Sequence, residues 1–226
     1  MSGVYTKFCP GIYDEFIYVS SLFIANPKQS GKKQASSEGD WKQAFSLVFF
    51  IFILANTLLQ VSFGSYYNFF ALYMSDLAYT GLQTGAFIAT GVVAEVFIFI
   101  YAAQLLKRFN VLHLLAVSIF VTGLRWFCLA YFAHIATAIV FSQVLHAFSF
   151  ALSHVASIYF LSRFFSIEFQ SRAQAIYLSI SFGLGTAIGS YWSGITWENG
   201  QGAQTSFVHS GFIALISASL LLGLIV

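Results

Sequence analysis

Long apolar segments alternate with short polar breaks along most of this chain. Six such segments occur, at approximately 44–74, 82–105, 111–131, 135–160, 173–196 and 206–226. An α-helix needs about 20 predominantly apolar residues to cross the hydrocarbon core of a bilayer. The breaks between the segments are short, as in a compact bundle. The pattern therefore predicts an all-α integral membrane protein that folds as a bundle of six transmembrane helices.

The first apolar segment is longer than a membrane crossing requires. It covers about 31 residues, which at about 1.5 Å each would reach about 46 Å, whereas the hydrocarbon core measures about 30 Å. Near its middle the chain reads Ser62, Phe63, Gly64, Ser65. Because glycine and hydroxyl side chains accommodate a local break in a membrane helix, we expect a kink there.

Composition agrees with residence in a membrane. Hydrophobic residues make up 58% of the chain and charged residues only 8%, whereas soluble domains carry about 25% charged residues. The net charge of +2 is too small and too dispersed to indicate a nucleic acid partner. Cys9 and Cys128 have no neighbours at metal or redox spacing, so no metal or cofactor is expected.

Basic residues occur before the first apolar segment and in every second break after it, and the other breaks contain none. They include Lys28, Lys32, Lys33, Lys42, Lys107, Arg108, Arg163 and Arg172. The positive-inside rule places such regions in the cytoplasm. An even number of spans returns the carboxyl terminus to the same side. We therefore expect a multi-pass protein of the cell (inner) membrane with both termini cytoplasmic.

Residues 1–42 differ in kind from the rest of the chain. Residues 27–42 have the composition of a flexible, polar cytoplasmic linker. Before them, 12–26 are weakly apolar, but this stretch is short and contains Asp14 and Glu15, so it does not predict a membrane span. It is interpreted as the end of a helix whose beginning lies outside this chain. The predicted domains are thus a leader at 1–42 and a six-helix domain at 43–226.

Three ionisable residues lie inside apolar segments: Glu95, Arg125 and His146. A charged side chain at the centre of a bilayer costs at least about 2.5–3.5 kcal/mol, so such residues usually face a protein interior or a water-filled path. Counting helical rise places Glu95 about 20 Å and His146 about 17 Å from the uncharged side of the membrane. Arg125 lies about 21 Å from the basic side. Glu95 and His146 are therefore expected at nearly the same level.

Two interpretations of these residues remain open. In the functional one, Glu95 and His146 take up and release protons, and Arg125 modulates them or holds an anionic substrate. In the other, the three form a static polar cluster and Arg125 extends to the lipid headgroups. His154, farther along the same segment as His146, is expected near the cytoplasmic interface in a structural role.

Two further groups of residues are candidates for a site or an interface. Tyr66, Tyr67 and Asn68 can bind a polar or anionic ligand, or they can belong to the aromatic belt at the membrane surface. Gly185 and Gly189 form a GxxxG pattern that permits close helix approach in lipid. A second stripe of small residues contains Gly85 and Gly91. These glycines are candidate helix-packing positions in an interface with another bundle.

The motifs GVVAE (91–95), LRW (124–126) and LHAFSF (145–150) together resemble the carboxyl-terminal half of a major facilitator superfamily transporter. More narrowly, the chain resembles the phenylpropionate permease group, relatives of the lactose permease family, over about 43–226. The resemblance implies twelve helices in two six-helix halves. It also implies proton symport and alternating access around a cavity between those halves.

The resemblance assigns roles to the three ionisable residues. Lactose permease carries a glutamate, an arginine and a histidine on its eighth, ninth and tenth helices, which match Glu95, Arg125 and His146 if this chain supplies helices seven to twelve. The lactose permease pattern also has an acid one turn after the histidine, where this chain has Ser149. Whether Glu95 or His146 carries the proton therefore stays open. Since the chain begins its resemblance at helix seven, it implies a separate amino-terminal half or a second copy as partner.

The leading hypothesis is a half of a secondary transporter that carries a small organic acid with protons, an aromatic acid such as phenylpropionate being a candidate. The alternative is a membrane protein without transport activity. It would be either a remnant of a split gene or a six-helix scaffold that dimerises through its glycine-bearing faces. An enzyme is not expected, because no nucleophile with a base and no metal-ligand spacing occurs.

Overall fold

The computed structural model describes residues 38–225, and every regular element among them is a helix. The predicted leader at 1–42 therefore lies outside the described residues, apart from 38–42. The elements are α2 (Glu38–Ala44), α3 (Leu47–Ser62), α4 (Gly64–Asp76), α5 (Gly81–Arg108), α6 (Val111–Phe132), α7 (Ala136–His146), the π-helical η1 (Ala147–Leu152), α8 (Ser153–Phe164), α9 (Gln170–Tyr177), the π-helical η2 (Leu178–Leu184), α10 (Gly185–Trp197), the short η3 (Glu198–Gly200) and α11 (Ala203–Ile225).

Five helical runs are long and apolar enough to cross a membrane. They are Leu47–Asp76, Gly81–Arg108, Val111–Phe132, Ala136–Phe164 and Ala203–Ile225, and they correspond to five of the six predicted segments. The remaining segment, 173–196, is helical too, through α9, η2 and α10, but it is not among these five. Its crossing of the membrane stays a prediction. The expected all-α membrane bundle is confirmed.

The predicted break in the first span lies where the glycine and hydroxyl residues indicated it. α3 ends at Ser62 and α4 begins at Gly64, with Phe63 between them. The hydroxyl of Ser62 donates to the carbonyl of Leu59 at 2.6 Å, and the Phe63 N–H bonds to Gln60 instead of continuing the regular ladder. Gly64 is required for packing as well, because a Cβ there would overlap the backbone of Gly189 in α10.

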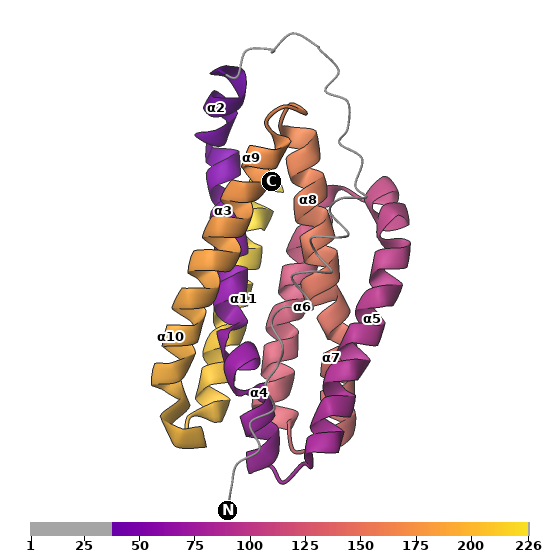
Figure 1. Cartoon of the computed structure of the whole chain (residues 1–226), viewed down its shortest axis with the longest axis vertical. Helices are drawn as coiled ribbons and strands as arrows, with labels where there is room; N and C mark the ends of the chain where they lie inside the picture. Colours follow the sequence, from indigo (N-terminus) through magenta and orange to yellow (C-terminus); the bar gives the residue numbers. More distant parts are fainter. Residues whose placement is uncertain (1–37, 226) are drawn as a thin grey trace, which may run out of the picture. The chain divides into compact units, whose positions relative to one another are not determined.

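Helix packing divides the bundle into two sides. On one side α5 lies along α7 and η1, and α6 packs against α7, η1 and α8 (Figure 1). On the other side α10 packs against α3 and α4, while α11 lies along both α3 and α6. Trp126 of α6 is fully buried between these sides, and its indole N–H donates to Ser62 at 3.1 Å.

Basic residues gather at one end of the bundle. The end of α5, the end of α8 and the beginning of α9 lie at the same end as α2 (Figure 1), and these elements carry Lys42, Lys107, Arg108, Arg163 and Arg172. The carboxylate of Asp40 in α2 accepts hydrogen bonds from the N–H and hydroxyl of Ser166, at 3.1 and 2.6 Å. These bonds join α2 to the connection between α8 and α9.

Candidate functional site

Glu95 of α5 and His146, the last residue of α7, are in direct contact. The Nε2 atom of His146 lies 2.8 Å from Oε1 of Glu95. The two side chains are only 10% and 16% exposed, so both are largely withdrawn from the surroundings of the bundle. The sequence placed them at nearly the same depth on two helices, and the structure brings them together. A proton gained or lost by either group changes the charge of this pair.

A glycine allows the helices that carry this pair to approach. Gly91 lies one turn before Glu95 on α5 and is buried against α7. A Cβ at this position would lie 3.1 Å from Oε1 of Gln143 and 3.3 Å from Cδ2 of His146. Both distances are tighter than ordinary packing, so with a larger residue the side chains of Gln143 and His146 would have to shift. Gly91 therefore leaves room for these two side chains between α5 and α7.

Arg125 of α6 is fully buried beside this pair. Its Nε donates to the backbone carbonyl of Ser142 at 3.0 Å. The guanidinium carbon lies 4.2 Å from the ring centroid of Tyr66 and 4.4 Å from that of Trp126, which are favourable cation–π distances. The side chain thus stays inside the bundle and does not extend to the headgroups. The terminal nitrogens, Nη1 and Nη2, have no hydrogen-bond partner among the described residues.

Tyr66 of α4 connects the arginine to α7. Its hydroxyl donates to Oε1 of Gln143 at 3.0 Å, and its ring lies 5.5 Å from the His146 ring, centroid to centroid. Gln143 is fully buried, and its Nε2 has no hydrogen-bond partner within the described chain. The sequence analysis did not identify Gln143. Its position one turn before His146 on the same helix face was the available signal.

Phe63, the residue at the break between α3 and α4, completes an aromatic frame around the site. Its ring packs edge-on against Trp126 at 5.1 Å and against His146 at 6.0 Å, and Arg125 lies 5.9 Å from its centroid. The sequence analysis predicted a kink here but gave the phenylalanine no role. The irregular backbone places an aromatic ring among the ionisable groups.

The other two predicted substrate residues, Tyr67 and Asn68, differ in their relation to Tyr66. The ring of Tyr67 lies 5.7 Å from that of Tyr66, centroid to centroid. Tyr67 stacks on Phe63 at 5.2 Å and is 47% exposed, so its hydroxyl lies at the edge of the cluster. Asn68 faces α10, where its amide donates to the carbonyl of Gly64 at 2.8 Å and to the hydroxyl of Ser190 at 2.9 Å. The structure therefore brings Tyr66, but not Asn68, together with Arg125 and His146.

The helix that carries His146 becomes π-helical directly after it, at η1. π-helical turns are uncommon and frequent at functional sites. Three rings stack along this stretch: His146 lies 5.8 Å from Phe150, and Phe150 lies 6.3 Å from His154. Ser149, where the resemblance led us to look for an acid, is buried, and its hydroxyl donates to the carbonyl of Leu145 at 3.1 Å.

The other predicted packing glycines face two different environments. Gly185 and Gly189 lie against α3 within the bundle, where a Cβ would overlap Thr57 and Gln60 or Val61. Gly85 is exposed and has open space around it. Gly185 and Gly189 thus serve packing within this bundle, not the expected contact with another bundle. For Gly85 such a contact stays a prediction.

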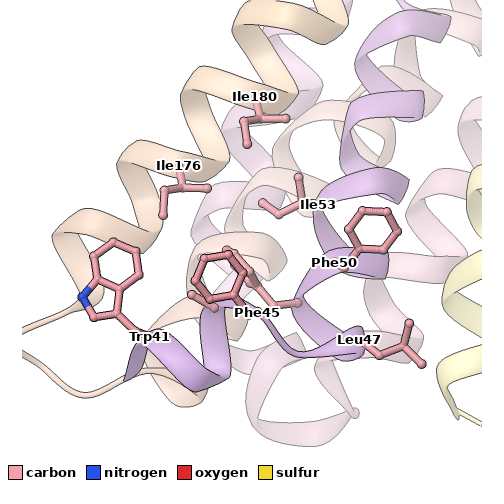
Figure 2. Close-up of a pocket in the computed structure, with 9 residues that line it drawn as sticks. Trp41, Phe45, Leu47, Phe50, Ile53, Ile176 and Ile180 are labelled. Carbon is pink, nitrogen blue, oxygen red and sulfur yellow. The ribbon is translucent and has the colours of Figure 1, made fainter. Parts of the chain in front are cut away.

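A separate groove lies near the basic end, between α2, α3 and α9 (Figure 2). It has a volume of about 510 Å³ and only apolar and aromatic lining residues, among them Trp41, Phe45 and Ile176. No ionisable side chain lines it, so it is unsuited to hold an acid. Across residues 38–225 no group of three histidine, cysteine or acidic side chains could hold a metal ion.

Two comparisons with known proteins found similarity to this chain. The model of the MFS_1 like family matches residues 4–209 of the chain. The chain is also 28% identical over 172 residues to the probable 3-phenylpropionic acid transporter of Escherichia coli (strain K12). That alignment covers 75% of this chain and 45% of the relative. The chain thus spans about half of the length of the relative that it matches.

Proposed function

The chain belongs to the MFS_1 like family of membrane transporters, and from this premise we propose that it is one half of a proton-coupled symporter for a small organic acid. It is a multi-pass membrane protein with a transport role, not an enzyme. Because the E. coli relative bears the name of a 3-phenylpropionic acid transporter, 3-phenylpropionate is the first candidate substrate.

The contact between Glu95 and His146 carries the proposal. Both side chains are ionisable, and both lie on helices long and apolar enough to cross the membrane. A buried hydrogen-bonded pair of this kind holds or releases one proton according to the charges near it. The nearest buried charge is Arg125, which lies over the ring of Tyr66, itself in contact with His146.

Coupling follows from the charges of these groups. An organic anion that binds at Arg125 neutralises the cation and thereby changes the electrostatic potential at Glu95 and His146. Uptake of a proton by the pair is then favoured, because the new negative charge stabilises the protonated form. Anion and proton would cross together with no net charge, which lowers the cost of moving either through a bilayer. Either Glu95 or His146 can carry that proton.

Substrate contacts are proposed for Arg125 and Tyr66 inside the cluster and for Tyr67 at its exposed edge. The rings of Tyr66, Phe63 and Trp126 surround the guanidinium and offer an apolar wall that suits an aromatic acid. Asn68, which is bonded to Ser190, would need to exchange that partner for a substrate.

We further propose that a second six-helix half faces the exposed sides of α5 and α10. α5 carries Gly85 with open space around it, and transporters of this general design place their substrate between two bundles. That half is either a separate amino-terminal chain or a second copy. The basic end of the bundle is proposed to be cytoplasmic, in the inner membrane, by the positive-inside rule.

Uptake by proteoliposomes tests the proposal. The full chain is reconstituted alone and together with the amino-terminal half of the E. coli relative, and uptake of radiolabelled 3-phenylpropionate is followed under an imposed proton gradient. We expect uptake that increases with the inward gradient and stops when a protonophore dissipates it. Absence of uptake in both preparations would contradict transport, and uptake indifferent to the gradient would contradict symport.

A further inference from the structure

Three buried nitrogen donors near the Glu95–His146 pair have no acceptor among the described residues. They are Nη1 and Nη2 of Arg125 and Nε2 of Gln143. Both side chains are fully buried. Buried donors in native proteins are nearly always hydrogen-bonded, and those that are not call for an explanation such as a ligand. Because the side chains of Arg125 and Gln143 both contact Tyr66, one ligand explains the three donors more economically than three separate packing defects.

Tyr66 contacts both Arg125 and Gln143 and orients their side chains. Its ring lies 4.2 Å from the guanidinium carbon of Arg125, while its hydroxyl donates to Oε1 of Gln143. Because Oε1 accepts this bond, the amide of Gln143 has a defined orientation, and its Nε2 is left as a donor. The backbone of Ser142, next to Gln143, holds the Nε of Arg125. The two terminal nitrogens are thereby free to act together.

The chemistry of these donors selects the ligand. Guanidinium nitrogens and an amide nitrogen donate hydrogen bonds and accept none, so the ligand must offer acceptors. A carboxylate has two oxygens that match the paired nitrogens of arginine, with lone pairs remaining for Nε2. A neutral amide has a single acceptor oxygen and carries no charge to neutralise Arg125. The donors therefore suit a carboxylate better than the corresponding amide.

We propose that Gln143 and Arg125 together bind the carboxylate of the transported acid, and that Gln143 makes the site discriminate between an acid and its neutral amide. This inference rests on the proposed function of the chain and adds to it a specificity-determining residue. Gly91 supports this arrangement, because its missing side chain leaves room for Oε1 of Gln143. The amide can therefore bond to Tyr66.

Access to the site requires local movement, since Arg125 is fully enclosed in this structure. The ring of Tyr66 covers the guanidinium, and it belongs to α4, which begins just after the break at Phe63. On the other side His146 is followed by the π-helical η1. Both segments depart from the regular α-helical ladder, so the proposal places the movement that separates the rings around Arg125 at these two segments.

Binding to the reconstituted protein tests this inference. The affinities of 3-phenylpropionate and of 3-phenylpropionamide are measured for the wild-type chain, for Gln143→Leu and for Gln60→Leu, in the preparation that shows uptake. Gln60 is also a buried glutamine, but it lies on α3 against Gly185. We expect Gln143→Leu to weaken binding of the acid at least about tenfold, or about 1.4 kcal/mol, with amide binding unchanged. Gln60→Leu should leave the preference for the acid intact.

A second variant covers the case in which Gln143→Leu does not fold. Gln143→Glu keeps the shape of the side chain and places a carboxylate beside Arg125, which would compete with the ligand. We expect it to lose acid binding and to retain amide binding. An unchanged ratio of acid to amide affinity in either folded variant overturns the inference while the proposed function stands. If the wild-type protein binds neither compound, the proposed function fails and the inference fails with it.

Discussion

The two sides of the bundle contain different kinds of buried polar side chain. Between α4, α10 and α11 the polar groups are neutral hydroxyls that bond to one another: Ser65 lies 2.7 Å from the hydroxyl of Ser206 and 3.0 Å from that of Ser210. Around α5, α6 and α7 the polar groups are ionisable, and several donors lack partners. Trp197 of α10 and His209 of α11 also have a nitrogen without a partner among the described residues. The two sides therefore differ chiefly in charge, since the side of α5, α6 and α7 combines an ionisable pair with a buried arginine.

Glycine has a different role on each side as well. Gly64 and Gly189 bring the backbones of α4 and α10 so close that a Cβ would overlap the opposite backbone. Gly91 instead faces the ends of two side chains, those of Gln143 and His146. Side chains move more easily than helix backbones. The comparison therefore indicates that the helices on the α10 side are held at a fixed distance, whereas the side chains between α5 and α7 can rearrange.

Replacement of Arg125 by leucine should give the largest effect and separate stability from function. The buried guanidinium has two nitrogens without partners, so its removal should leave the free energy of unfolding unchanged or raise it by about 1 kcal/mol. Uptake of 3-phenylpropionate should fall about 1,000-fold, since the anion loses its charged partner inside the bundle. Denaturant titration and the uptake assay measure the two effects. Arg163→Leu, at an exposed position of the basic end, is the control.

A marked loss of stability in Arg125→Leu would mean that the arginine holds the fold together. Arg125 would then be a structural residue, and the contrast between a structural side and a functional side of the bundle would fail.

Glu95→Gln should have the next largest effect. The amide keeps the size of the side chain and its ability to hydrogen-bond to His146, but it takes up no proton. Uptake driven by the proton gradient should fall about 100-fold, within the range usual for loss of a proton-transfer group. Glu198→Gln, on the exposed turn before α11, should behave as the wild type. Unchanged pH dependence of uptake in Glu95→Gln would refute a protonation role for Glu95.

Gly189→Ala tests the side that is proposed to be fixed. Its new Cβ would overlap the carbonyl of Val61, and only a shift of α10 away from α3 can relieve this. Destabilisation by about 2 kcal/mol is expected, as for other overpacked positions, while the folded fraction should keep its preference for acid over amide. Gly194→Ala, on the same helix with open space around it, should be neutral. Equal stability of the two variants would contradict close packing of α10 on α3.

The sequence predicted features that depend on position along one helix, and it missed those that depend on rotation between helices. The break next to Gly64 and the common level of Glu95 and His146 follow from local composition and from the constant rise per residue. The bond from Tyr66 to Gln143 does not, because it depends on how α4 and α7 face each other. Asn68 shows the same limit: it is two residues from Tyr66, yet it faces α10.

The π-helical segments were not predictable for a related reason. Sequence periodicity distinguishes helix from strand, whereas a π-turn differs from an α-turn by a single residue in its hydrogen bonding. In η1 that difference decides how His146, Phe150 and His154 align. Composition alone gave no signal for it.

The smallest expected effect belongs to Ser65→Ala, which tests whether the hydroxyl cluster is purely structural. The substitution removes one hydroxyl from a group in which Ser206 also receives a hydrogen bond from Thr196 at 3.0 Å. Because Ser206 keeps its bond from Thr196 and only Ser210 loses its partner among the described residues, the free energy of unfolding should fall by only about 1 kcal/mol. Ser219→Ala, at an exposed position of α11, should cost less still. If Ser65→Ala instead altered the proton dependence of uptake at unchanged stability, the hydroxyl cluster would share in proton transfer. The distinction between a side with a structural hydroxyl cluster and a side with a functional ionisable cluster would then have to be abandoned.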